Sequence, residues 1–396
     1  MHQANLHSAT AVKGVHKSDK ALSKAFDLVV FSHLRWDFVT QRPQHVIGRF
    51  AKDRKVLFVE EPIGYDPRCE GRANIIRVNH NLTVLQPCIN HDNLMDELEP
   101  IVKEYMQRLN ITNPNLWFYS AAFHEMTERI PHQAVIYDCM DELSAFRGAS
   151  KALIKLEKQL IQKADVIFTG GKSLYEAKRQ LSENVYCYPS SVDREHFEKA
   201  LEEATVVPDD MMHIPHPIVG YYGVIDERID LPLLDEIAQL RPNVSFVMIG
   251  PVVKISEADL PRHANLYYPG GKPYGELPAY LKAIDIAMMP FALNESTQFI
   301  SPTKTLEYIA ALKPIISTPI YDVKRDYSNV LAIINNAAEF VTALDQYLAE
   351  SNTVKEKRYQ DYESILQAVS WDKTVAGMKR NIDEAMTGIP QRSAAA

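Results

Sequence analysis

The feature that most constrains the fold is an alternation of short apolar runs with amphipathic stretches, repeated along most of the chain. Short apolar runs predict buried strands, whereas longer stretches with apolar residues at helical spacing predict helices. The predicted strands are 28–31, 56–59, 82–85, 116–119, 134–137, 166–168, 184–188, 218–222, 244–249, 286–289 and 315–318. The predicted helices include 43–51, 153–164, 231–240, 277–283 and 372–386. This order is typical of an α/β fold with mainly parallel sheets and helices on both faces.

A weakly patterned stretch with three prolines, 202–217, divides the alternation into two halves and is typical of a linker. The 396 residues are enough for two domains with separate cores. We predict a flexible tail over 1–25, a first doubly wound domain over 26–205, a second over 216–368, and a final helix over 370–388. In such sheets, ligands bind beyond the carboxyl ends of the strands, so the loops there are the candidate sites.

Composition and short motifs exclude several classes of protein. The formal net charge of -8 argues against a nucleic-acid binder, which needs a basic face. The four cysteines lack the spacing of a metal site and are predicted to be reduced thiols: Cys69, Cys88, Cys139 and Cys187. No run approaches the roughly 18 apolar residues of a membrane span, and no signal-peptide core, HExxH or GxSxG motif is found. We therefore expect a cytoplasmic protein without a metal centre.

A stretch beginning at Ser301 predicts a short helix with both ends encoded. Ser301 is a good N-cap, Pro302 suits the first turn, and Pro314 ends the helix. Lys304 lies in the first turn, where a cation opposes the helix dipole unless an anion is close. A phosphate there would complement the lysine and the free N–H groups, and Glu307 can accept hydrogen bonds from a ribose diol. The alternative is an ordinary amphipathic helix with a surface Lys–Glu pair.

The loop after the first predicted strand, 32–45, contains no glycine. This argues against a dinucleotide oxidoreductase, which carries GxGxxG at this place. The loop is instead rich in aromatic and hydrogen-bonding side chains, which suits a polyhydroxylated substrate. Trp36 would stack on that substrate, with Arg42 and Gln44 as donors. The alternative is that Trp36 packs the following helix onto the sheet.

Three carboxylates follow the strand predicted at 134–137, namely Asp138, Asp141 and Glu142. Their mutual repulsion tends to raise the pKa of at least one of them. We favour Asp141 as a general base or as the ligand of a sugar hydroxyl. The alternative is that Glu142 caps the next helix and that Asp138 bonds to the backbone.

Two glycine-containing loops mark the second half. Gly223 allows a ligand to approach the backbone closely, and Arg228 is suited to bidentate phosphate binding. A second turn at 270–271 precedes Lys272 and Tyr274, and its backbone suits contact with a base edge, with Tyr274 nearby for stacking. The alternative is a simple strand-to-helix connection.

The helix predicted at 153–164 has a lysine-rich face opposite its apolar face. The lysines are Lys151, Lys155, Lys158 and Lys163. Such a face is usually solvated, and it also suits contact with an anionic membrane surface.

Several of these segments together resemble one known family, the GT-B glycosyltransferases, and within it family 4, also described as glycosyl transferases group 1. The resembling segments are Trp36 with 41–44, 164–167 with Ser173, 189–193 with Phe197, the Ser-Pro-x-Lys-x-x-Glu-Tyr helix at 301–308, and Ser-Trp-Asp at 370–372. The resemblance covers most of the chain. It implies two Rossmann-like domains facing across a cleft, with a C-terminal helix crossing back to the N-terminal domain.

The resemblance also implies a function. A sugar would move from a UDP- or GDP-sugar, with UDP favoured, to a glycan or lipid-linked acceptor, without a metal or other cofactor. Glu307 would hold the ribose, and Arg228 and Lys304 would neutralise the diphosphate and act in catalysis together with Asp141. The donor-binding set is completed by Gly223, Lys272, Tyr274, Ser301 and Thr303. The first domain would take the acceptor, and the setting would be bacterial surface polysaccharide synthesis at the inner face of the membrane.

The chain departs from the family pattern at one position. Family 4 usually carries a Glu-x7-Glu pair, and Phe299 stands where its first Glu is expected, while Glu295 has the wrong spacing. Asp141 lies where an inverting relative places its base. Retention and inversion of the configuration at the anomeric carbon of the transferred sugar therefore both stay open at this point. Two other classes also fit the sequence: a nucleotide-sugar epimerase of similar fold, and a non-catalytic nucleotide-sugar-binding protein.

Overall fold

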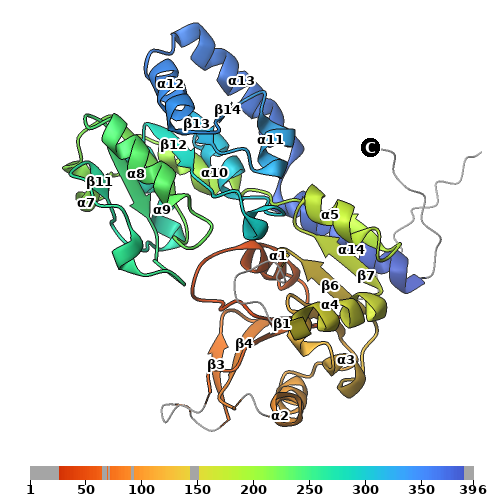
Figure 1. Cartoon of the computed structure of the whole chain (residues 1–396). Helices are drawn as coiled ribbons and strands as arrows, with labels where there is room; N and C mark the ends of the chain where they lie inside the picture. The colour runs from red at the N-terminus through yellow and green to blue at the C-terminus, as the bar shows by residue number, and fades with distance from the viewer. Residues whose placement is uncertain (1–25, 65–68, 70–71, 91–92, 143–150, 388–396) are drawn as a thin grey trace, which may run out of the picture.

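The structure is a computed structural model that describes residues 26–64, 69, 72–90, 93–142 and 151–387. The predicted tail over 1–25 and the chain end at 393–396 lie outside these residues. Figure 1 shows two α/β halves, each built on its own sheet, with the second half above the first. The α/β class predicted from the alternation is therefore confirmed.

The first half contains an eight-stranded sheet in the order β3-β4-β2-β1-β5-β6-β7-β8. Its strands are β1 Leu28–Ser32, β2 Val56–Glu60, β3 Ala73–Arg77, β4 Leu82–Pro87, β5 Asn115–Phe118, β6 Val135–Cys139, β7 Val166–Thr169 and β8 Val185–Cys187. All neighbouring strands are parallel except β3 and β4, which form an antiparallel hairpin. Every residue of the central strand β1 is buried.

Helices cover both faces of this sheet. They are α1 Arg42–Phe50, α2 Leu94–Arg108, α3 Met126–Arg129, α4 Lys151–Lys163 and α5 Lys172–Lys178. The next helix, α6 Arg194–Glu198, packs instead onto the second half, where its Phe197 joins the core. Alternate residues of β1 point into two different apolar clusters, as the two-residue period of a strand requires. Val29 and Phe31 join a cluster with α2 and α4, whereas Leu28 and Val30 join a cluster with α1.

The second half contains a parallel six-stranded sheet in the order β11-β10-β9-β12-β13-β14. Its strands are β9 Ile218–Tyr222, β10 Ser245–Ile249, β11 Leu266–Tyr267, β12 Ile286–Met289, β13 Ile315–Ser317 and β14 Ala332–Ile333. Its helices are α7 Asp209–Met212, α8 Leu231–Leu240, α9 Leu277–Ala283, α10 Lys304–Ala310, α11 Tyr321–Tyr327, α12 Ala337–Leu348 and α13 Asn352–Ala368. Met211 of α7 is buried in this core, so the stretch predicted as a linker contains a helix that packs onto the second half.

The last helix, α14, covers Trp371–Thr387 and returns to the first half. Its buried residues Trp371, Val375, Met378 and Ile382 join the apolar cluster on the α1 face of the first sheet. Figure 1 shows α14 running alongside the first half rather than the second. The C-terminal helix that crosses back, expected from the resemblance, is confirmed.

The helix predicted to start at Ser301 begins later in the structure. α10 covers Lys304–Ala310, and Thr303 is its N-cap. The prediction that Ser301 caps this helix is wrong, because a tight turn precedes the regular helix: the amide N–H of Thr305 donates to the carbonyl of Pro302 at 3.3 Å. Ser301 consequently stays in the loop before the helix.

The prediction that all four cysteines are reduced is wrong for two of them. Cys69 and Cys88 form a disulfide, with their Cα atoms 6.4 Å apart. The amide N–H of Cys88 donates to the carbonyl of Arg72 at 2.8 Å, so the hairpin of β3 and β4 returns the chain to the segment that carries Cys69. Sequence spacing does not reveal this pairing, because it depends on the hairpin. Cys139 and Cys187 are free thiols.

Candidate active site

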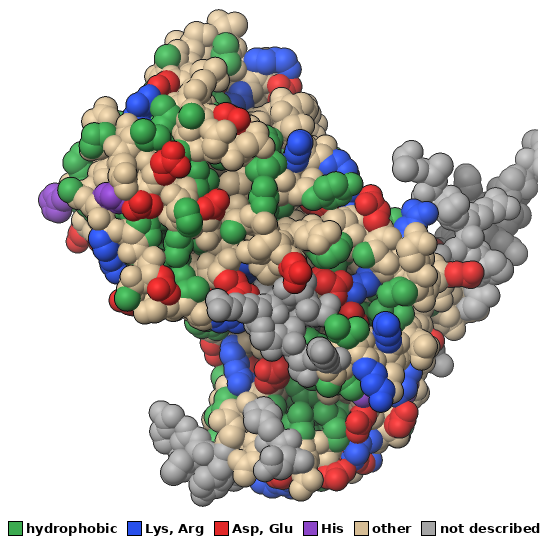
Figure 2. Space-filling model, in the orientation of Figure 1, with side chains coloured by type: hydrophobic (Ala, Val, Ile, Leu, Met, Phe, Trp, Pro, Cys, Tyr) green, Lys and Arg blue, Asp and Glu red, His purple; other side chains and the backbone are tan. Residues whose placement is uncertain are grey.

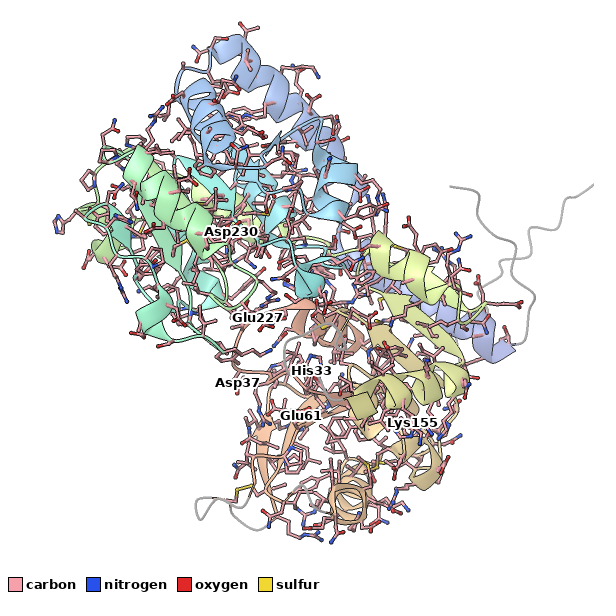
Figure 3. The ribbon with its side chains drawn as sticks, viewed as in Figure 1. His33, Asp37, Glu61, Lys155, Glu227 and Asp230 are labelled. Carbon is pink, nitrogen blue, oxygen red and sulfur yellow. A yellow bond between two sulfur atoms is a disulfide. The ribbon has the colours of Figure 1, made fainter. Side chains whose placement is uncertain are left out.

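A cavity with a volume of about 130 Å³ lies between the two halves, at the carboxyl ends of strands from both sheets. The first half lines it with the loops after β1, β6, β7 and β8, and the second half with the loop after β9 and the segment before α10. Figure 2 shows the molecular surface indented between the two lobes. Figure 3 shows His33, Asp37 and Glu61 of the first half on the side that faces Glu227 of the second.

Gly223 and Lys304 are in contact on the second-half wall of this cavity. Gly223 has a φ of +138°, and a Cβ there would lie 2.3 Å from Cε of Lys304, so only glycine leaves room for this lysine. The Lys304 ammonium lies 5.6 Å from the centre of the Tyr221 ring. Within the described part of the chain it forms no ion pair. Burial lowers the pKa of Lys304, and the nearby Glu307 opposes this in part.

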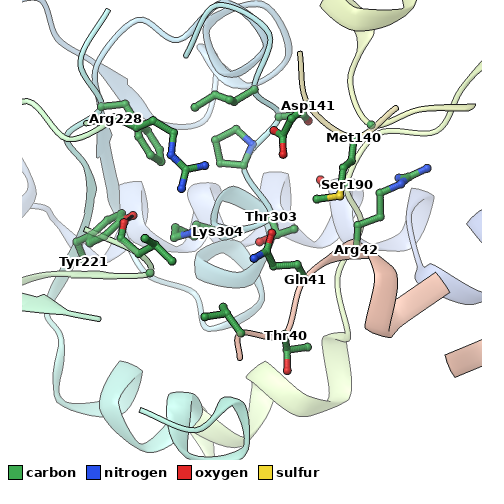
Figure 4. Close-up of a pocket in the computed structure, with 18 residues that line it drawn as sticks. Thr40, Gln41, Arg42, Met140, Asp141, Ser190, Tyr221, Arg228, Thr303 and Lys304 are labelled. Atoms are coloured by element: carbon green, nitrogen blue, oxygen red, sulfur yellow. Dashed lines mark hydrogen bonds between the residues drawn. The ribbon is translucent and has the colours of Figure 1, made fainter. Parts of the chain in front are cut away.

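Arg228 reaches the same cavity from the loop after β9. Its Nε and Nη2 atoms donate to the two carboxylate oxygens of Asp226 at 2.9 and 2.8 Å. Burial works to lower the pKa of Arg228, but these hydrogen bonds raise it, and the net direction is upward. The guanidinium is therefore charged and held in one direction, and Figure 4 shows it pointing into the cavity. Arg228 and Lys304 together place two cationic side chains on one wall.

Asp141 faces this wall from the first half, directly after β6. Figure 4 shows its carboxylate directed into the same space as Arg228. Burial raises the pKa of Asp141, and the charge of Arg228 opposes this in part. A carboxylate with a raised pKa in a cavity is suited to proton transfer. The structure thus brings the three predicted catalytic residues, Asp141, Arg228 and Lys304, around one cavity, and three predicted donor residues line it as well: Gly223, Ser301 and Thr303.

Glu307 lies one turn after Lys304 but does not line the cavity. Its side chain is 6% exposed and accepts a hydrogen bond of 2.5 Å from the phenol of Tyr222. Burial raises the pKa of Glu307, while Lys304 and the Tyr222 hydrogen bond lower it in part. Thr303 also contributes a hydrogen bond to this carboxylate, and a carboxylate has enough lone pairs to accept from a ligand in addition. The ribose contact stays a prediction.

Arg42 lines the cavity, but its guanidinium is already engaged within the first half. Nε donates to Asp138 at 2.9 Å, and Nη1 donates to the backbone carbonyl of Tyr188 at 2.7 Å. The Arg42 and Asp138 side chains are only 2% and 0% exposed. This ion pair ties the start of α1 to the end of β6. Acceptor binding by Arg42 stays a prediction.

Arg42→Ala is expected to lower the free energy of unfolding by about 3–5 kcal/mol, because it leaves the Asp138 carboxylate buried without its partner. Urea unfolding followed by circular dichroism measures this. Arg49→Ala is the matched control on the same helix, since its partner Asp372 is 68% exposed and exposed pairs contribute only about 0–1 kcal/mol. Equal effects of the two substitutions would show that the buried pair is not a structural link.

Trp36 and Gln44 lie outside the cavity lining. The Trp36 ring meets the Phe58 ring edge-on, with centroids 5.0 Å apart. The side-chain amide of Gln44 donates to the Trp36 carbonyl at 2.8 Å, and its oxygen accepts from the Gln41 N–H at 2.9 Å. Both residues therefore shape the loop that carries Gln41 and Arg42 to the cavity. Direct contact of Trp36 and Gln44 with an acceptor stays a prediction.

Lys272 and Tyr274 also lie outside the cavity lining. The Lys272 ammonium forms an ion pair with Asp210 at 2.6 Å. The Tyr274 ring stacks on His196, with centroids 4.3 Å apart, and meets His45 of the first half at 5.5 Å. Tyr274 is thus part of the contact between the halves, and donor binding by these two residues stays a prediction.

Several cavity residues were not predicted as site residues, namely Thr40, Gln41, Met140, Gly170 and Ser190, although Gln41 and Ser190 belong to segments that resemble the family. A Cβ at Gly171 would lie 2.6 Å from the Asp322 carboxylate and 3.0 Å from Cβ of Ser301. Glycine after β7 therefore lets the two halves approach each other closely. The sequence did contain a signal for this close contact, because two successive glycines, Gly170 and Gly171, follow the strand predicted at 166–168.

Phe299, which stands where the family carries its first Glu, packs against the core of the first half. Glu295 is exposed in the short 3-10 helix η6, Glu295–Thr297. Neither residue lines the cavity. The position that would contact the donor sugar in the family is used here for packing between the halves.

Metal and membrane features were also sought in the described residues. Among them, no group of three or more His, Cys, Asp or Glu side chains is placed to hold a metal ion. Over the same ranges, none of the helices combines the length and the apolar character needed to cross a bilayer. On α4, Lys155 and Lys158 are exposed, and Lys163 pairs with Glu128 at 2.7 Å.

The two Rossmann-like halves, the cavity between them and the returning helix define the GT-B fold, the architecture of many glycosyltransferases. Sucrose-phosphate synthase of Thermosynechococcus elongatus superposes with a TM-score of 0.71 at 13% identity, over 92% of this chain and 100% of that one. A structure described as trehalose-6-phosphate from E. coli bound with UDP-2-fluoro glucose superposes with a TM-score of 0.66 at 12% identity, over 90% and 99% of the two chains. At these identities the likeness establishes the fold.

Sequence comparison adds the class of protein. Residues 216–350 match the family model described as glycosyl transferases group 1. The chain is also 27% identical, over 290 residues, to the putative teichuronic acid biosynthesis glycosyltransferase TuaH of Bacillus subtilis (strain 168), which covers 67% of this chain and 70% of that protein. The expected resemblance to group 1 glycosyltransferases is confirmed, and the protein is a glycosyltransferase.

Proposed function

We propose that the protein transfers a sugar from a nucleotide diphosphate sugar, with UDP as the nucleotide, to a glycan or lipid-linked acceptor. The observation that carries this proposal is the pair of cationic side chains, Lys304 and Arg228, on one wall of the cavity between the halves. Lys304 is half-buried and, within the described residues, has no ion-pair partner. A partly buried cation of this kind is stabilised by a bound anion. The diphosphate of the donor is that anion.

The proposed reaction breaks the bond between the anomeric carbon and the diphosphate oxygen, which leaves negative charge on the diphosphate. Lys304 and Arg228 stabilise this charge more strongly in the transition state than in the bound donor, and that difference accelerates the reaction. Asp141 accepts the proton of the acceptor hydroxyl as the new glycosidic bond forms. Two cations already flank the site of charge, so the scheme needs no metal.

The nucleotide and the setting are proposed from the related proteins. The E. coli structure of the same fold holds UDP-2-fluoro glucose, which favours UDP as the nucleotide. The Bacillus relative is named for teichuronic acid biosynthesis, which favours a cell-surface polysaccharide as the product. Both inferences concern the identity of the substrates and leave the roles of Lys304, Arg228 and Asp141 unchanged.

Entry of the donor requires the halves to separate. The cavity of about 130 Å³ is smaller than the sites of roughly 300–1,000 Å³ that usually hold small molecules. We infer that the arrangement described here is a closed one, in which Gly171 meets Asp322 across the interface at close range. Closure of this kind excludes water from the reacting groups.

A peripheral position at the inner face of the membrane is also proposed, with the rest of the protein in the cytoplasm. The support is α4, where Lys155 and Lys158 are exposed while Leu160 and Ile161 are buried. Exposed lysines near a surface of anionic lipids are attracted to it.

Incubation with a panel of UDP- and GDP-sugars, with and without glycan acceptors, tests the proposed reaction against its rivals. Slow release of free UDP without acceptor, and faster release with it, is the expected result. A changed sugar without nucleotide release would instead identify an epimerase. A thermal shift by nucleotide sugars without any turnover would identify a binding protein.

Glu307→Ala is expected to weaken binding of a UDP-sugar by about tenfold or more, because hydrogen bonds to a charged group contribute about 1.5–3 kcal/mol each. Isothermal titration calorimetry measures the affinity. Glu307→Gln keeps an oxygen for the Tyr222 phenol but carries no charge, so it separates loss of ribose binding from loss of local packing. Unchanged affinity in both folded variants would refute the ribose role.

A further inference from the structure

A buried lysine, Lys178, is linked to the loop that carries Asp141. Lys178 is the last residue of α5, and its side chain is only 4% exposed. Lysine side chains are almost never fully buried unless they are paired. The transfer mechanism proposed above gives this lysine no part, and it does not line the cavity between the halves. Its partners indicate what it does.

The Lys178 ammonium bridges two carboxylates from different segments. It lies 2.8 Å from Oε2 of Glu142, the residue after Asp141, and 2.7 Å from Oε1 of Glu157 on α4. Burial works to lower the pKa of Lys178, but the acidic groups around it raise it, and the net direction is upward. The ammonium is therefore charged, and it joins α4 and α5 to the loop after β6.

Hydrogen bonds connect this bridge to β6. The Glu157 oxygen that meets Lys178 also accepts from the phenol of Tyr137, on β6, at 2.7 Å. The thiol of Cys139, the last residue of β6, donates to the backbone carbonyl of Asp141 at 3.5 Å. The Glu157 end of the bridge and the Asp141 backbone are thus held by the same strand. The bridge to Glu142 adds a restraint on the other side of Asp141.

The bridge acts on Asp141 through position rather than through charge. Lys178 meets two carboxylates, so its own charge is already balanced. Burial raises the pKa of Asp141, and the charged groups that also shift it all lie in the second half. Loss of Lys178 would leave Glu142 and Glu157 to repel each other, which would move the loop. A displacement of about 1 Å near a reacting group can lower a rate by about 100-fold.

We propose that Lys178 is a positioning residue, whose bridge to Glu142 holds the Asp141 carboxylate where the acceptor hydroxyl loses its proton. This inference rests on the proposed function, in which Asp141 accepts that proton. A general base must lie within about 2.6–3.2 Å of the atom that gives up the proton, so the loop that carries it has to be held in place. The bridge supplies this restraint from outside the cavity.

Glu142→Gln and its matched control Glu157→Gln test the proposal, because each removes one carboxylate charge from the same lysine. The two side chains are 15% and 13% exposed, so the substitutions change similar surroundings. Glu142→Gln is expected to lower kcat for sugar transfer by about 10- to 100-fold and to leave KM for the donor within about threefold. Glu157→Gln, which is remote in sequence from Asp141, is expected to keep kcat within about threefold. Equal losses of kcat in the two variants would overturn the proposal.

Lys178→Met, alone and combined with Asp141→Asn, separates positioning from a general loss of structure. Alone, it is expected to lower kcat by about 10- to 100-fold. In the Asp141→Asn background, the same change should alter the single-turnover rate by less than about threefold, because residues that act as a unit are not additive. Thermal unfolding checks that each variant is folded at the assay temperature. If Lys178→Met does not fold, the comparison of Glu142→Gln with Glu157→Gln decides the question.

Two results of this cycle would overturn the positioning role. One is an unaltered kcat in folded Lys178→Met, and the other is an equal loss of rate with and without Asp141. A fully active Asp141→Asn variant would instead refute the proposed base, so failure of the positioning role and failure of the proposed function are distinguishable.

Discussion

Replacing Lys304 with methionine is expected to lower kcat/KM for the nucleotide-sugar donor by about 100- to 1,000-fold, because removing one preorganised group that stabilises developing negative charge has an effect of this size. Lys304 lines the cavity beside Arg228 and, within the described residues, has no ion-pair partner, so its charge is available to the diphosphate. Release of UDP with and without acceptor gives the rate. Most of the loss should appear in kcat, since the charge develops in the transition state.

Protein stability separates this role from a structural one. Burial lowers the pKa of Lys304, so keeping its charged form in the folded protein costs some stability relative to the unfolded chain. A neutral methionine of similar length should therefore leave thermal stability unchanged or raise it. Lys324→Met is the control, since Lys324 is exposed on α11, and it should alter neither rate nor stability. A fully active Lys304→Met variant, or one that is inactive only because it unfolds, would refute the proposed role.

Asp141→Asn is expected to lower kcat by about 100- to 10,000-fold while donor affinity stays within about threefold, because an amide cannot accept the proton of the acceptor hydroxyl. Asp141 faces the two cationic side chains from the opposite half. Single-turnover measurements with saturating donor separate the chemical step from binding. The exposed Asp37, which Figure 3 shows on the first half, provides the control substitution Asp37→Asn.

The pH dependence of the transfer rate provides a second test of the role of Asp141. Burial raises the pKa of Asp141, and a general base is active only when it has lost its proton. The rate should therefore fall on the acid side at a pH above that expected for an ordinary aspartate, and recover as the pH rises through the raised pKa. In Asp141→Asn this acid limb should disappear. An unchanged acid limb in the variant would remove Asp141 from the proton transfer.

Much of the fold was predictable, because most strands are short and fully apolar. Every residue of β1 and β9 is buried. A short run of almost only apolar residues is expected in the interior of a fold, so it predicts a buried strand. Among the features that escaped prediction, two did so for the opposite reason. α13, Asn352–Ala368, buries only Arg358, Tyr362 and Leu366, so its pattern has almost no apolar face. β3 is an edge strand whose Ile75 and Ile76 are partly exposed, which blurs the alternation of a strand.

The candidate site was predictable where it depends on the ends of parallel strands. Gly223, Arg228 and Asp141 lie in loops that follow strands, and parallel strands bring such loops to one edge of each sheet. For two other candidate site residues, the position in a loop after a strand does not show whether the side chain is available to a ligand. Arg42 pairs with Asp138 and Lys272 with Asp210, 96 and 62 residues away. Side chains that looked available for a ligand are used to hold segments together, and only their packed positions reveal it.

The sequence by itself determined the α/β class, the two halves and the set of polar residues at strand ends, because burial of apolar surface depends on local pattern. The tertiary structure alone decided which distant residues meet. It paired Cys69 with Cys88, and it placed Gly171 against Asp322 across the interface. Such contacts depend on how whole elements pack and on the angle between the halves, and no short-range pattern encodes that angle.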